Sequence, residues 1–96
     1  MPDRTAEEAA RAHADATIAI DLGTTLREMT PEAMSKVMQL GNRGWTFTSY
    51  KLAPQGRDGG DYLFRITYAT EDGPLPLDYR FREIDGEWRV VDIARA

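Results

Sequence analysis

Apolar and polar residues alternate along the last third of the chain. From Leu75 to Arg82 every second residue is apolar. Successive side chains of a strand point to opposite faces, so this pattern predicts a strand with one buried and one wet face. The dipeptide Asp85-Gly86, which is typical of a tight hairpin turn, follows. Residues 88–93 then form the predicted returning strand.

Two earlier segments also have strand character. Tyr62–Ala69 alternates in the same way, and Trp45–Leu52 is rich in aromatic and β-branched residues. Between them, Pro54–Gly60 has the composition of a loop, and Glu71–Pro74 that of a hairpin turn. The sequence therefore predicts four consecutive antiparallel strands.

Helical spacing dominates the first part of the chain. Thr5 and Glu8 occupy the two positions of a capping box, which predicts a helix from there to about Leu22, ending at Gly23. A short helical turn is expected next.

A third helix is expected from Thr30 as N-cap, with Pro31 at its first position, to Gly41. Helices over about residues 5–41 thus precede a sheet over about residues 45–94, in a single domain of residues 1–96. The predicted fold class is α+β, with N-terminal helices packed on a curved four-stranded antiparallel sheet.

This order of elements, with the ending Asp-Gly-Glu-Trp-Arg-Val-Val-Asp at residues 85–92, resembles the NTF2-like (cystatin-like) superfamily. The chain is similar to the small SnoaL-like and ketosteroid-isomerase-like domains of that superfamily. The resemblance implies a half-barrel whose concave face, closed by the helices, holds a pocket. It also implies frequent homodimers formed through the sheet. Relatives include isomerases, cyclases, small-molecule binders and interaction modules, so the fold does not choose among them.

Composition removes several classes of function. A net charge of −4 argues against a nucleic-acid partner. The absence of cysteine excludes disulfides, a thiolate nucleophile and a zinc–thiolate site. With one histidine and no phosphate-binding glycine loop, we expect neither a metal site nor a cofactor.

No apolar run approaches the roughly 20 residues that span a bilayer, so no membrane partner is expected. The N-terminus has no apolar core of a signal peptide. The chain is expected to be cytoplasmic if it is complete, and exported if a leader has been removed.

Two residues are candidates for proton transfer. His13 lies on a helical stripe of small residues expected to face the sheet, where it would be a general base or a hydrogen-bonded core residue. By alternation, Asp92 shares a strand face with Trp88 and Val90, which would raise its pKa in an apolar pocket. Its alternative role is an ion pair with a neighbouring arginine, and the opposite parity of this strand is equally apolar.

Aromatic and methionine side chains supply candidate pocket walls, because such side chains line sites for apolar ligands. Plain core packing is the alternative for each of them. The candidates are Ile20, Met34, Met38, Trp45, Phe47, Phe64, Tyr79 and Trp88.

Four arginines fall at strand positions opposite the main apolar faces. They predict either a binding or dimer surface or a solvated face with cross-strand ion pairs. These candidates for an interface are Arg65, Arg80, Arg82 and Arg89.

The leading functional hypothesis is a non-catalytic domain that binds an apolar small molecule between helices and sheet, as a homodimer. One alternative is an isomerase- or cyclase-type enzyme that uses His13 and Asp92. The other is a protein-interaction module that uses the arginine-bearing face.

Overall fold

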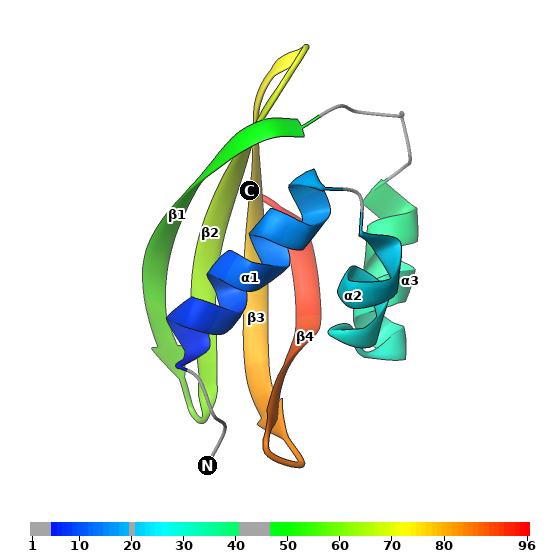
Figure 1. Cartoon of the computed structure of the whole chain (residues 1–96). Helices are drawn as coiled ribbons and strands as arrows, with labels where there is room; N and C mark the ends of the chain where they lie inside the picture. The colour runs from blue at the N-terminus through cyan, green and yellow to red at the C-terminus, as the bar shows by residue number, and fades with distance from the viewer. Residues whose placement is uncertain (1–4, 20, 41–46) are drawn as a thin grey trace.

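A computed structural model describes residues 5–19, 21–40 and 47–96. Three helices precede a four-stranded sheet, as expected for an α+β chain (Figure 1). The helices are α1 (Ala6–Ile18), α2 (Leu22–Arg27) and α3 (Pro31–Leu40). The strands are β1 (Phe47–Asp58), β2 (Asp61–Thr70), β3 (Gly73–Ile84) and β4 (Glu87–Arg95).

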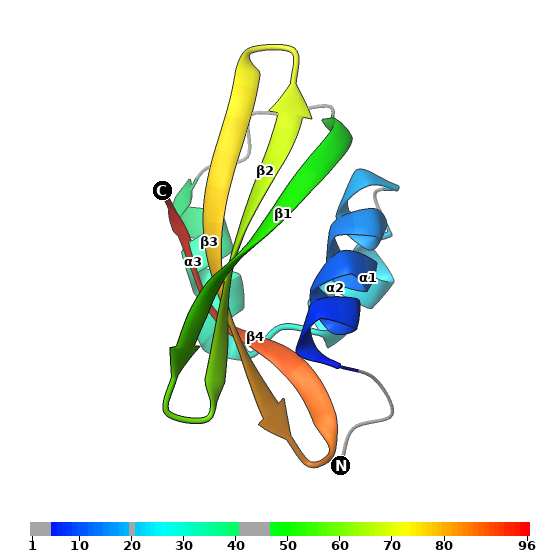
Figure 2. The same ribbon diagram turned by 90° about the vertical axis from the view of Figure 1, so that its left-hand side faces the viewer.

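The sheet is an antiparallel meander in the order β1-β2-β3-β4. Its twist is plain in Figure 2, where α1 lies to one side of the strands. The turn between β3 and β4 has positive φ at both Asp85 (54°) and Gly86 (81°), as a type I′ hairpin requires. The predicted hairpin is thereby confirmed.

The first helix starts as predicted and ends earlier than expected. Glu8 donates its backbone N–H to the Thr5 hydroxyl at 3.1 Å and accepts the Thr5 N–H on its carboxylate at 2.8 Å. The expected end at Gly23 is wrong, because α1 stops at Ile18 and Gly23 lies within α2. A separate helix, α2, begins after Asp21, because the Asp21 side chain accepts the backbone N–H of Thr24 and caps the helix.

The segment between α2 and α3 is tied to the edge of the sheet. The Val90 N–H donates to the Glu28 carbonyl at 2.7 Å, and the Thr30 N–H donates to the Val90 carbonyl at 3.0 Å. Met29 therefore forms a single parallel bridge with β4. The Thr30 hydroxyl accepts the Ala33 N–H at 3.3 Å, which confirms the predicted cap of α3.

The loop expected over Pro54–Gly60 is mostly strand. β1 continues to Asp58, and only the glycine pair before Asp61 turns the chain. A register shift between Pro54 and Gly56, with φ of 113° at the glycine, marks an irregularity in this edge strand. Proline is tolerated at such a position because an edge strand lacks one neighbour.

A bulge in β4 reverses the alternation that the sequence implied. Phe81 pairs with Val90, yet Arg80 pairs with Asp92, so Val91 is the extra residue. The expected shared face of Asp92 with Trp88 and Val90 is therefore wrong. Asp92 follows Arg80 to the outer face of the sheet, away from α1.

The core lies between α1 and the inner face of the sheet. Apart from His13, the buried residues of α1 are alanines, namely Ala6, Ala9, Ala10 and Ala14. These small residues allow the helix to approach the strands closely. The side chains that form the core on α1 and on the strands are Ala6, Ala10, Ala14, Phe64, Ile66, Tyr68, Leu75, Leu77, Tyr79, Phe81, Val90 and Ile93.

Among the helices described here, none has the length and apolar character needed to cross a bilayer.

Candidate functional site

His13 is completely buried between α1 and the sheet. Its Nδ1 atom lies 3.2 Å from Oε1 of Glu28, in the segment that bridges to β4. Its Nε2 atom is also buried and has no hydrogen-bond partner among the described residues. A buried polar atom without a partner is uncommon in native proteins, so Nε2 is a candidate for binding a ligand.

Two aromatic rings of β3 surround the imidazole. The ring centroid of Tyr79 lies 5.5 Å from that of His13, at an interplanar angle of 69°. The Phe81 ring lies at 6.1 Å and 82°. The imidazole therefore projects from an alanine-rich helix into an aromatic environment, in which a polar atom loses the hydrogen bonds that water would give it.

A pair of tyrosine hydroxyls lies in the same layer. The hydroxyl oxygens of Tyr68 and Tyr79 are 3.0 Å apart. Burial raises the pKa of Tyr68, and its hydrogen bonds with Tyr79 and Thr17 partly offset this. Burial likewise raises the pKa of Tyr79 well above its ordinary value. Both phenols are therefore neutral hydrogen-bonding groups at physiological pH.

Thr17 joins the helix to this tyrosine pair. Its hydroxyl donates to the backbone carbonyl of His13 at 2.8 Å, one helical turn back. Together His13, Thr17, Glu28, Tyr68 and Tyr79 form what we call the inner polar cluster. It is the set of polar side chains that converge between α1, the segment before α3 and the inner face of the sheet.

The predicted pocket residues are only partly brought together. Phe64 and Tyr79 are buried in the core beneath α1. Phe47 is partly buried and stacks on Tyr68 with centroids 4.7 Å apart. Trp88 is partly exposed and packs edge-on against Tyr62 at 5.3 Å.

The remaining predicted pocket residues come from the helices and the following loop. Met34 is partly buried on α3. Ile20, Trp45 and the side chain of Met38 lie outside the part of the chain that is described.

Asp92 does not join His13. Its side chain is about half exposed, and its carboxylate lies 3.7 Å from Nζ of Lys36 on α3. Its Oδ1 also accepts the backbone N–H of Ile93 at 3.0 Å. The ion pair that was the alternative for Asp92 is present, with a lysine in place of the expected arginine.

On the outer face, Arg80 and Arg82 both bind Asp61. Arg80 Nη1 and Arg82 Nε lie 2.8 Å from the two oxygens of this carboxylate, and Arg80 also reaches Asp58 at 2.8 Å. The guanidinium groups cover Asp61, which is 5% exposed. They lower its pKa to about 2, with the hydrogen bond from Arg82 as the largest cause.

The other two arginines are also paired within the chain. Arg65 donates to both oxygens of Asp78, the residue opposite it in the β2–β3 register, at 2.8 and 3.3 Å. Arg89 binds Glu87 at 2.9 Å and donates to the backbone carbonyl of Arg27 at the end of α2. All four predicted interface arginines thus have acidic partners inside the chain.

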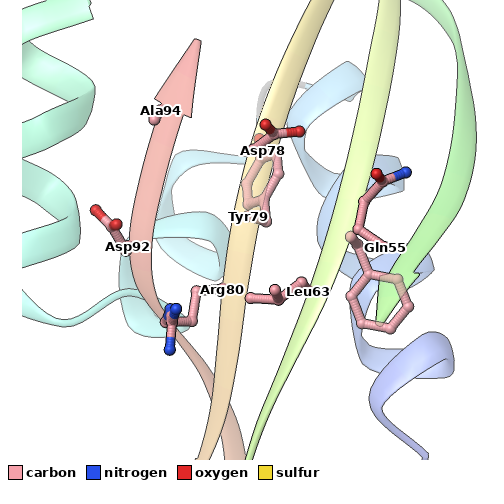
Figure 3. A pocket seen from close by; sticks show the side chains of 8 residues that line it. Gln55, Leu63, Asp78, Tyr79, Arg80, Asp92 and Ala94 are labelled. Atoms are coloured by element: carbon pink, nitrogen blue, oxygen red, sulfur yellow. The ribbon is translucent and has the colours of Figure 1, made fainter. Parts of the chain in front are cut away.

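A shallow depression of about 220 Å³ opens on the outer face (Figure 3). Asp78 and Arg80 of β3 and Asp92 of β4 give it a charged rim of mixed sign. It lies on the opposite side of the sheet from α1. The residues that line it are Gln55, Leu63, Phe64, Asp78, Tyr79, Arg80, Asp92 and Ala94.

In the described part of the chain, no group of three or more histidine, aspartate or glutamate side chains is placed to hold a metal ion.

Three members of the inner polar cluster were missed by the sequence analysis. Tyr68 carried a usable signal, because it shares the strand alternation of Phe64 and so must share its face. For Glu28 and Thr17, no pattern in the sequence indicates a position next to the sheet. Glu28 is 15 residues from His13, and only the bridge between Met29 and β4 brings the two together.

The chain was compared with known protein families, with curated proteins and with solved structures, and nothing matches in any of the three.

Proposed function

We propose that the chain is a non-catalytic, NTF2-like domain that binds a small, mainly apolar molecule between α1 and the inner face of the sheet. The observation that carries this proposal is the inner polar cluster itself. Binding sites for small molecules are mostly apolar and contain a few convergent polar groups that fix orientation. Here the unpartnered Nε2 of His13 and the Tyr68–Tyr79 hydroxyl pair are such groups, within aromatic walls.

The NTF2-like half-barrel is part of the same proposal. It is supported by the order of three helices followed by an antiparallel meander, and by the twist of the sheet around α1 (Figure 2). The one inner face that α1 covers is where a half-barrel places its ligand.

The proposal includes a homodimer formed through the outer face. The ion pairs there join Arg65, Arg80 and Arg82 to Asp58, Asp61 and Asp78, which is three charges of each sign. The whole chain carries −4. Two acidic copies repel less across a neutral face than across any acidic one.

Native mass spectrometry of the protein as purified tests both parts. We expect a dimer that retains a small molecule under gentle conditions and releases it on denaturation. A matched variant, Thr67→Arg, adds an unpaired charge to the outer face, and we expect it to yield monomers that still hold the molecule. An empty protein that also fails to bind added p-cresol or p-xylene would contradict the ligand proposal.

An isomerase- or cyclase-type enzyme is a second candidate, favoured by the contact between the His13 imidazole and the Glu28 carboxylate. A carboxylate on one ring nitrogen orients an imidazole and leaves its other nitrogen to accept a proton, which suits a general base. This candidate predicts hydrogen–deuterium exchange at the α-carbon of a ketone such as cyclohexanone in D₂O. The exchange should be lost in His13→Gln and retained in Asp92→Asn. Equal exchange in both variants would exclude it.

A further inference from the structure

The inner polar cluster also specifies which polar group a ligand must carry, an inference that rests on the proposed function. Glu28 Oε1 lies 3.2 Å from His13 Nδ1. An ionised carboxylate has only acceptor positions, so the hydrogen between these atoms belongs to Nδ1. A neutral imidazole has one hydrogen, and Nε2 is then left as an acceptor with a free lone pair.

No described group satisfies that lone pair. Nε2 is fully buried, and the neighbouring surfaces are the rings of Tyr79 and Phe81. The hydroxyls of Tyr68 and Tyr79 contact one another, that of Thr17 donates to the His13 carbonyl, and none of the three lies within hydrogen-bond distance of Nε2. The Nε2 lone pair therefore lies in an apolar environment without a hydrogen-bond donor.

We propose that Nε2 of His13 binds a hydroxyl group on an otherwise apolar ligand, such as a phenol, and that Glu28 is the positioning residue that fixes the required tautomer. A ligand hydroxyl would restore the hydrogen bond that the buried nitrogen lacks. A hydrocarbon of the same shape would leave Nε2 unpaired, and an aldehyde or ketone would place a second acceptor against it.

Entry to this position requires α1 to separate slightly from the sheet. Apart from His13, which packs on Tyr79 and Phe81, the residues of α1 in the core cluster are Ala6, Ala10 and Ala14. On the helix side, separating alanines exposes less apolar surface than separating leucines or phenylalanines would. The alanine-rich face is therefore compatible with a ligand that inserts beside His13.

The test compares three probes of similar shape: p-cresol, which donates a hydrogen bond, p-xylene, which has no polar group, and 4-methylbenzaldehyde, which only accepts. Because His13 is the only histidine, histidine labelled with ¹⁵N in the ring gives one imidazole to observe. We expect hydrogen on Nδ1 and a bare Nε2 before addition. With p-cresol, the Nε2 resonance should shift and binding should be at least about tenfold tighter than for the other two probes.

Variants separate positioning from packing. His13→Leu should remove the preference for p-cresol over p-xylene. Glu28→Gln, whose amide can also donate to Nδ1, should mix the two tautomers and reduce the preference, whereas Glu32→Gln, on the exposed first turn of α3, should leave both unchanged. The tautomer measurement needs only the wild-type protein, so it tests whether Nε2 is a bare acceptor even where a variant does not fold.

The outcomes are distinct for the two proposals. If all three probes bind equally, or if Nε2 carries the hydrogen, the hydroxyl inference is overturned and the binding function stands. If none of the three binds, the proposed function fails, and this inference fails with it.

Discussion

The hydroxyl groups of Tyr68 and Tyr79 meet at 3.0 Å in the core beneath α1, although the two residues lie on different strands. Both rings are almost fully buried, so neither hydroxyl is able to exchange its partner for bulk water. Removing one of the two hydroxyls therefore lowers the free energy of unfolding, because the other is left buried without its partner. Removing both has little further effect.

The first prediction concerns this tyrosine pair. Tyr68→Phe leaves the Tyr79 hydroxyl buried without its partner and should cost about 1–2 kcal/mol of unfolding free energy. Tyr79→Phe should cost less, because Tyr68 keeps its hydrogen bond with Thr17. The double variant should cost no more than Tyr68→Phe alone. Urea denaturation of all three gives the double-mutant cycle, and simple additivity would show that the hydroxyls are not coupled.

The second prediction is a loss of stability in acid. The pKa of Asp61 is about 2 in the folded chain, against 3.8 for the ordinary carboxyl. A lowered folded pKa stabilises the native state above the unfolded value, and this contribution disappears as the pH falls from about 4 to about 2. Because the cluster lies at the surface and is screened, the loss should be about 1 kcal/mol.

Asp61→Asn isolates that contribution. The variant should be less stable than the wild type at pH 7 and nearly equal to it at pH 2. Asp78→Asn is the matched control, since its partner Arg65 is 44% exposed and the pair should contribute under about 0.5 kcal/mol. Parallel pH profiles for wild type and Asp61→Asn would refute the assignment.

The third prediction tests the bulge at Val91. Val90 is completely buried, so Val90→Ala should cost about 2 kcal/mol. Asp92→Ala should change the unfolding free energy by less than about 0.5 kcal/mol, because the side chain is half exposed on the outer face. Chemical denaturation of the two variants distinguishes the bulged register from regular alternation, which would place both side chains in the core and make both substitutions costly.

The fourth prediction concerns the β3–β4 turn. Gly86 has a φ of 81°, a left-handed backbone conformation that is unfavourable for residues with a Cβ even where the surrounding space is open, so Gly86→Ala should cost about 1 kcal/mol. Gly60 has no left-handed φ and open space where a Cβ would be, so Gly60→Ala should have little effect. Thermal melts of the two variants provide the comparison, and equal losses would contradict the type I′ assignment.

Local patterns predicted the elements well where one physical rule acted alone. The alternation of Leu75–Arg82, the Asp85-Gly86 turn and the Thr5 cap each specify a conformation within a few residues. These rules need no information from distant parts of the chain.

The errors arose where local patterns were ambiguous. Val90, Val91 and Ile93 are all apolar, so both faces of β4 satisfied the alternation and nothing indicated the bulge. Pro54 and its neighbouring glycines are typical of loops, yet an edge strand accommodates them because one side needs no ladder.

The site depends on tertiary contacts that no local pattern contains. Glu28 reaches His13 because Met29 bridges to Val90, and Asp61 meets two arginines about 20 residues later because β2 pairs with β3. From the sequence, His13 and Tyr79 were expected on the inner face, where they lie. The side of the sheet that Asp92 occupies stayed open, because both parities of its strand are apolar.

An NMR titration with p-cresol tests most directly whether a ligand binds between α1 and the sheet. We expect saturable shifts and intermolecular NOEs from p-cresol to His13, Tyr79 and Phe81. NOEs confined to Leu63 and Ala94 on the outer face, or an absence of saturable shifts, would contradict binding at this position.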